Sequence, residues 1–197
     1  MAETLEEFLA RVASEAPTPA GGAVAALTVA ASAALVAMVG RVTLAREPGA
    51  AEVARETVET ADRLRLAATE LGIEDSAAYT RLLEARRQGP AERSAAVATA
   101  LRRATDVPVA ITRAARNVLA AAARLTEVAR VSTLSDLSVA TTLAWAALEA
   151  GAVTARSNLA VSEDEGYARD GVTELARLID EGAALRRRSL AIVEKRR

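Results

Sequence analysis

The segment between Glu15 and Arg41 carries no charged side chain, and it constrains the fold more than any other part of the chain. At about 1.5 Å per residue, a helix of this length could cross the hydrocarbon core of a bilayer. Alanine is the commonest residue of the segment, however, and the segment follows the acidic sequence AETLEEF, whereas a secretory signal begins with basic residues. We therefore interpret it as a helix at the centre of a tight bundle or subunit interface, and not as a membrane anchor.

The types of apolar residue favour an all-α fold. Alanine supplies about half of the hydrophobic residues, and only 2% of the chain is aromatic. A core of Ala, Leu and Val suits closely packed helices better than a sheet, which favours β-branched and aromatic residues. A chain of 197 residues fits one hydrophobic core. We expect residues 1–197 to form a single bundle of long alanine-rich helices without strands.

Proline and glycine mark the expected helix boundaries. The expected elements are a helix over 4–14, a long helix ending near residue 45, a helix over 50–71, a turn at Gly72 with a short helix to residue 87, a long helix from residue 91 with a kink or a change of helix at Pro108, an alanine-rich helix after RVST, and a last helix over 167–195.

Charge and missing residue types exclude several functional classes. The chain has 25 basic and 26 acidic residues, which argues against a nucleic-acid-binding protein. It contains no cysteine and no histidine. Disulfides, thiol nucleophiles, the usual zinc sites and imidazole acid–base catalysis are therefore excluded, and we expect no metal. Any chemistry must use carboxylates, hydroxyls, amides, Lys or Arg, and the absence of cysteine fits a cytoplasmic protein.

The sequence PTPAGGAVAAL places a glycine-rich turn before the long uncharged helix. Free backbone N–H groups at such a helix start can bind an anion or a carbonyl oxygen. Taken alone, Gly21 and Gly22 are better explained as a tight corner that lets two helices approach.

Two aspartates are the other candidates for chemistry. Asp75 lies four residues before Tyr79, so the two share a helix face and could position a substrate amine or act in proton transfer. Asp136 follows Ser135 just inside an apolar helix. For both aspartates, capping of a helix N-terminus is the simpler interpretation. Asn158 faces the same way as Asp136, but about 33 Å further along the helix, so only a long ligand or a second subunit could connect them.

Taken in order, six segments resemble the cyclodeaminase/cyclohydrolase family of folate enzymes. They are FLARVASEAPTPAGGAVAAL, MVGRVT, EDSAAY, ALRRATDVPVAI, SDLSVA and ARSNLAVSED, which together cover nearly the whole chain. The resemblance implies an all-helical subunit that forms a homodimer or a higher homo-oligomer, with a folate site near the subunit interface.

The resemblance also implies a set of site residues. Asp75 and Asp136 are the implied catalytic residues, without an assignment of acid and base. The implied folate-binding residues are Pro19, Gly21, Gly22, Tyr79, Arg130, Ser135, Arg156 and Asn158. Among these, Arg130 and Arg156 are candidates to pair with the carboxylates of the glutamate tail.

The implied activity is a one-carbon reaction on tetrahydrofolate. The first possibility is formimidoyltetrahydrofolate cyclodeaminase, which forms 5,10-methenyltetrahydrofolate and ammonia. The second is methenyltetrahydrofolate cyclohydrolase, which forms 10-formyltetrahydrofolate. Three departures from the family's pattern, at Ala20, Arg130 and Thr154, leave a third possibility, an inactive folate-binding or structural oligomer.

Overall fold

The computed structural model describes residues 3–196, and the described part of the chain is all-α, as predicted. The α-helices are α1 (Leu5–Val12), α2 (Gly21–Arg46), α3 (Ala51–Arg86), α4 (Pro90–Thr126), α5 (Leu134–Leu159) and α6 (Glu165–Arg196). Short 3-10 helices, η1 (Pro48–Ala50) and η2 (Val131–Thr133), precede α3 and α5.

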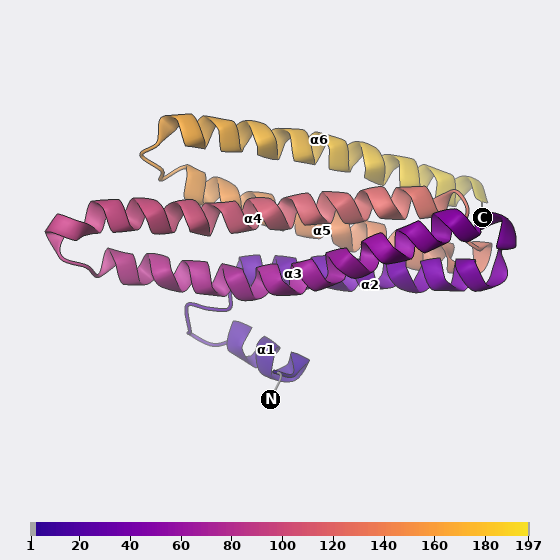
Figure 1. Ribbon diagram of the computed structural model, residues 1–197, viewed down its shortest axis with the longest axis horizontal. Coiled ribbons are helices and arrows are strands. Elements are labelled where there is room, and N and C mark those ends of the chain that lie inside the picture. The colour runs from indigo at the N-terminus through magenta and orange to yellow at the C-terminus, as the bar shows by residue number, and fades with distance from the viewer. Residues whose placement is uncertain (1–2, 197) are drawn as a thin grey trace.

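The five long helices form one elongated bundle (Figure 1). α2 packs against α3, α4 and α5, and α4 also packs against α3, α5 and α6. In the view of Figure 1, α3 and α4 lie in front of α2 and α5, while α6 runs along one edge and α1 stands apart from the bundle. α2 and α5 form the layer behind α3 and α4 in this view. In that layer, the N-terminal end of α2 lies next to the C-terminal end of α5.

The uncharged segment forms α2, a helix that is apolar on all sides and contributes much of the core. Its buried side chains are mostly alanine and valine, which allow neighbouring helices to approach closely. Buried Ser32 donates a hydrogen bond of 2.7 Å from Oγ to the Ala140 carbonyl of α5. By length and composition α2 and α5 could each cross a membrane, but 61% of the most apolar window of α2 is buried inside the bundle, as in the core helix of a soluble protein.

One predicted boundary is wrong. Gly72 does not end a helix, because α3 continues without a break through residues 51–86. A Cβ atom on Gly72 would lie 3.4 Å from the Ala26 Cβ of α2, so the glycine lies where α2 and α3 approach each other. Packing along the whole length of α2 outweighs the cost of one helical glycine, about 1 kcal/mol.

Candidate functional site

A small pocket lies where the N-terminal end of α2 and the C-terminal end of α5 meet the middle of α3 and α4. Its volume is about 270 Å³. Five of the predicted site residues line it: Gly21, Gly22, Asp75, Tyr79 and Asn158. Four residues that were not predicted as site residues complete the lining: Pro17, Ala20, Ala104 and Thr154, of which Ala20 and Thr154 are departures from the family's pattern. Helices distant in sequence thus bring half of the ten predicted site residues to one place.

Asp75 is the buried carboxylate of this pocket. It lies in the middle of α3 and is 9% exposed, so the simpler interpretation, that it caps its own helix, is wrong. Its carboxylate instead accepts a hydrogen bond from the backbone N–H of Ala23, in the first turn of α2. Burial raises the pKa of Asp75 above its usual value, and the Ala23 hydrogen bond offsets part of that rise. A carboxyl group with a raised pKa and an adjacent helix N-terminus is suited to proton transfer.

Gly22 allows this close approach of Asp75 to α2. A Cβ atom on Gly22 would collide with both carboxylate oxygens of Asp75 and lie 2.5 Å from its Cγ. Gly21 is different, because a Cβ atom there would have no neighbour within 4 Å. The N-cap residue, Ala20, provides no side-chain hydrogen bond to the helix start. The first N–H groups of α2 therefore have no side-chain cap from Ala20, and the helix start that carries them lines the pocket beside Asp75.

The amide of Asn158 is held in one orientation because one backbone hydrogen bond of α4 is missing. Pro108 has no N–H, so the Ala104 carbonyl loses the donor that an uninterrupted helix would provide. Asn158 supplies that donor from α5, through a hydrogen bond of 2.7 Å from Nδ2 to the Ala104 oxygen. Because a carbonyl can only accept a hydrogen bond, Nδ2 must face Ala104, and Oδ1 is left as the acceptor that Asn158 presents to the pocket. α4 also continues through Pro108 as one helix.

We expect the Asn158→Ala substitution to lower the free energy of unfolding by about 1–3 kcal/mol, because it leaves the partly buried Ala104 carbonyl without a donor. In a Pro108→Ala background the same change should cost less, since the new N–H of residue 108 can bond to the Ala104 oxygen. Denaturant unfolding of the four proteins in this double-mutant cycle measures the difference. If Asn158→Ala lowers the free energy of unfolding equally in both backgrounds, Asn158 does not replace the donor that Pro108 lacks.

The remaining predicted residues do not line the small pocket. Ser135 and Asp136 lie in the first turn of α5, and Arg130, just before η2, contacts Glu47 at 3.8 Å. Because α5 is a continuous helix to Leu159, Asp136 is separated from Asn158 by about 33 Å, as the spacing predicted. Pro19 is buried next to the pocket, after a cis peptide bond with Thr18. Arg156 is exposed and lines a separate, shallow hollow between α5 and α6.

Two of the unpredicted lining residues have a signal in the sequence. Thr154 is one helical turn before Asn158, and Ala104 is four residues before Pro108, the position whose carbonyl a proline leaves free. Pro17 and Ala20 belong to the turn before α2. Ala20 has an extended backbone, φ −128° and ψ −161°, which alanine adopts without strain.

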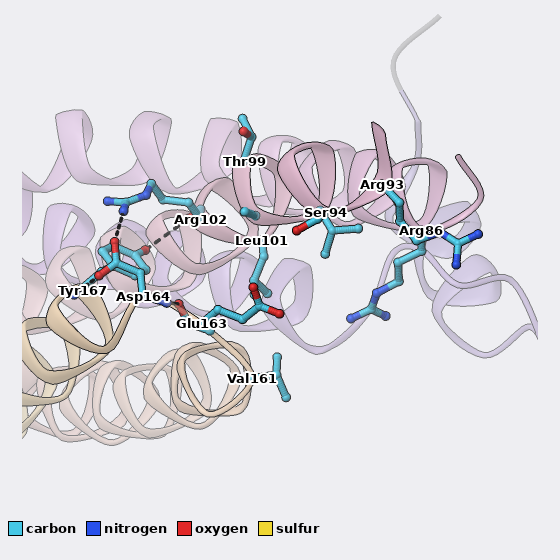
Figure 2. Close-up of a pocket in the computed structure, with 13 residues that line it drawn as sticks. Arg86, Arg93, Ser94, Thr99, Leu101, Arg102, Val161, Glu163, Asp164 and Tyr167 are labelled. Atoms are coloured by element: carbon cyan, nitrogen blue, oxygen red, sulfur yellow. Dashed lines mark hydrogen bonds and ion pairs between the residues drawn. The ribbon is translucent and has the colours of Figure 1, made fainter. Parts of the chain in front are cut away.

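A second cavity, of about 680 Å³, lies beside the small pocket, toward the turn between α3 and α4 (Figure 2). Leu101 lines this cavity and Ala104 lines the small pocket, so the two hollows are one turn of α4 apart. At one end Tyr167 donates a hydrogen bond of 2.7 Å to the Asp106 Oδ1, and the Arg102 guanidinium lies 4.2 Å from the centre of the Tyr167 ring. Burial, and then the hydrogen bond to Asp106, raise the pKa of Tyr167.

Comparisons with known proteins show the family and the fold of the chain. Residues 4–190 match the family described as formiminotransferase-cyclodeaminase. A methenyltetrahydrofolate cyclohydrolase of Methylorubrum extorquens is 33% identical over 202 residues, which cover 98% of this chain and 97% of the relative. The crystal structure of formiminotetrahydrofolate cyclodeaminase from Thermotoga maritima superposes with a TM-score of 0.93 at 25% identity, covering 98% of this chain and 96% of that one.

Proposed function

The chain belongs to the formiminotransferase-cyclodeaminase family, and from that premise we propose that it is a folate enzyme that hydrolyses 5,10-methenyltetrahydrofolate to 10-formyltetrahydrofolate. The observation that carries the proposal is the buried Asp75 carboxylate at the start of α2. The full-length similarity to a methenyltetrahydrofolate cyclohydrolase supports this reaction. The small pocket contains one carboxylate among its lining residues, Asp75, which is the candidate for proton transfer in this reaction.

In the proposed mechanism, Asp75 acts as a general base on a water molecule. The water oxygen bonds to the methenyl carbon, and its proton passes to the Asp75 carboxylate. The bond between that carbon and N5 then breaks, N5 receives the proton from Asp75, and the second water proton is released as the formyl C=O forms. The N–H groups at the start of α2 can stabilise the partial negative charge that develops on this oxygen as its second proton leaves. Asn158 Oδ1 can accept a hydrogen bond from a pteridine N–H.

The cyclodeaminase reaction is the second candidate, supported by the similarity to formiminotetrahydrofolate cyclodeaminase. There N10 attacks the formimino carbon and loses its proton to the formimino nitrogen. A further proton from a carboxylic acid then allows ammonia to leave and the methenyl cation to form. Because burial raises the pKa of Asp75, its carboxyl holds a proton to higher pH than an exposed aspartate does, and in that form it can supply this proton.

The absorbance band of the methenyl compound distinguishes the two reactions. We expect purified protein to accelerate the loss of the band from 5,10-methenyltetrahydrofolate. Formation of the band and of ammonia from 5-formiminotetrahydrofolate would instead assign the cyclodeaminase. Folate binding without either change would contradict the enzyme proposal and leave an inactive folate-binding oligomer.

We also propose a homodimer that forms through α2 and α5. Exposed apolar side chains follow both helices: Val24, Leu27 and Met38 on α2, and Val139 and Val153 on α5. A helix that is apolar on all sides is normally buried on all sides, and a continuous exposed apolar face marks an interaction surface. A second copy of the chain would cover this face with an identical one.

The direction of these helices determines which residues such a dimer would bring together. The start of α2 and the end of α5 share the small pocket, while Glu47 and Arg130 place the end of α2 next to the start of α5. α2 and α5 are therefore antiparallel. A twofold axis perpendicular to both helices would exchange their ends between the subunits. Asp136 of the partner subunit would then lie near the small pocket, and both predicted aspartates could contact one folate.

Ala34 tests this interface, because it lies between Leu27 and Met38 on the exposed face of α2. We expect Ala34→Glu to fold but to shift the protein from dimer to monomer, since two buried carboxylates would face each other across the axis. Sedimentation velocity measures the change. The matched control is Ala176→Glu on the exposed side of α6, which should remain dimeric. A wild-type monomer, or a dimeric Ala34→Glu protein, would contradict the proposed interface.

A further inference from the structure

The small pocket cannot hold a whole folate. Its volume of about 270 Å³ lies below the roughly 300–1,000 Å³ of most small-molecule sites, whereas the neighbouring cavity of about 680 Å³ lies within that range. A ligand whose reacting atoms contact Asp75 must therefore continue beyond the small pocket. The neighbouring cavity begins one turn of α4 away, at Leu101.

The far end of that cavity presents two arginines. Figure 2 shows Arg86, from the end of α3, and Arg93, from the first turns of α4, together at the end opposite Arg102 and Tyr167. Arg102 is paired with Asp164 at 2.6 Å. Among residues 3–196, by contrast, neither Arg86 nor Arg93 has a carboxylate within ion-pair distance. Arg93 donates only from Nε, to the Gln88 carbonyl at 3.0 Å.

The wall between the two ends is largely apolar. Leu101 and Val97 of α4 and Val161 after α5 line it. Along α3, Asp75, Tyr79 and Arg86 lie on one face, because their spacings of four and seven residues are close to whole helical turns. The path from Asp75 to Arg86 is therefore straight and about 16 Å long. From Asp75 to Arg86, a ligand would contact first a carboxylate with hydrogen-bonding groups, then an apolar wall, and last two guanidinium groups without ion-pair partners.

We propose that Arg86 and Arg93 bind the carboxylates of the substrate's glutamate tail, while the apolar wall contacts the p-aminobenzoyl ring. This inference rests on the proposed function, since it assumes that the pteridine end lies at Asp75. A pteridine, a benzoyl ring and a glutamate joined end to end match the length and the order of these surfaces. Guanidinium groups bind carboxylates through paired, charge-assisted hydrogen bonds. Arg86 and Arg93 thereby take the role that the sequence analysis gave to Arg130 and Arg156.

Glu163 gives the proposal a second, opposite test. It is exposed and lines the same cavity between the two ends, where its charge repels an anionic tail. Removing its charge should therefore strengthen tail binding, whereas removing the arginines should weaken it. A surface that only stabilises the fold would not show this change of sign.

The test compares KM for three methenyl substrates that differ only in the tail: none, one glutamate and three glutamates. For wild-type protein we expect KM to fall as glutamates are added. We expect Arg86→Ala/Arg93→Ala to raise KM at least tenfold for the glutamate-bearing substrates, to leave KM for the tail-less substrate unchanged, and to leave kcat unchanged for all three. Glu163→Gln should lower KM for the glutamate-bearing substrates. The control, Arg87→Ala, removes a neighbouring exposed arginine that does not line the cavity and should match wild type.

A wild-type KM that does not depend on the tail, or an equal rise for all three substrates in the double variant, would overturn the tail site. Neither result would affect the proposed function, which fails only if wild-type protein turns over none of the three substrates. Added salt should also raise KM for the glutamate-bearing substrates more than for the tail-less one, because it screens exposed charges.

Discussion

Replacing Asp75 by asparagine is expected to lower kcat for methenyltetrahydrofolate hydrolysis by about 10²–10⁴-fold, the usual contribution of a general base. Asparagine has the same shape and can still accept the hydrogen bond from the Ala23 N–H, but it cannot take a proton from water. We expect the free energy of unfolding to stay level or rise at neutral pH, because the substitution removes a buried charge. Steady-state kinetics and denaturant unfolding separate the two effects.

The pH dependence gives an independent measure of Asp75. In wild type, burial raises its pKa above 3.8, so activity that needs the carboxylate should rise with pH through a midpoint above that value. The same shift means that the stability contributed by the protonated group is present below pH 3.8 and is lost as pH rises through the higher folded pKa. Asp75→Asn should abolish both dependences. Asp62→Asn, which removes a carboxylate paired with Arg41 on the surface, should keep both.

The Gly22→Ala substitution is expected to have the second-largest effect. The new methyl group would collide with the Asp75 carboxylate, so either the carboxylate or α2 must move. We expect kcat to fall at least tenfold and the free energy of unfolding to fall by about 1–3 kcal/mol, the usual cost of overpacking. Kinetics and unfolding of the purified variant measure both quantities.

Gly21→Ala is the matched control for this change. It adds the same methyl group one residue earlier, where nothing beyond its chain neighbours and its own helix backbone lies within 4 Å, so the free energy of unfolding should stay the same or rise slightly. The loss of stability in Gly22→Ala should shrink in an Asp75→Ala background, which removes the colliding carboxylate. If Gly21→Ala and Gly22→Ala behave alike, the contact between Gly22 and Asp75 does not have the role assigned to it.

The fold could be predicted from the sequence because its signals are local and agree with one another. Alanine-rich segments bounded by PTPAGG and EPGA define α2, and the position of RVST marks the start of α5. Gly72 and Pro108 were harder to interpret, because each is a helix breaker by propensity. In both cases contacts between helices decide the outcome: Gly72 lies against Ala26, and Asn158 bonds to the carbonyl that Pro108 leaves free.

The site could be predicted only in part. The glycine turn, Asp75 and Asn158 were selected as separate motifs, and the structure brings them into one pocket. What the sequence could not give is the relation between them, because the approach of Asp75 to the start of α2 depends on how α2 and α3 pack over their full lengths. The position of Arg86 and Arg93 at the end of a cavity depends likewise on the turn between α3 and α4.

The central claim is that the small pocket around Asp75 holds the reacting end of a folate. A crystal structure with 5-formyltetrahydrofolate, a stable compound that carries its formyl group on N5, tests it most directly. We expect the N5 and N10 edge to face Asp75, with a carboxylate oxygen about 2.6–3.2 Å from the formyl group or from one bridging water. A folate bound with its pteridine elsewhere and Asp75 untouched would contradict the account.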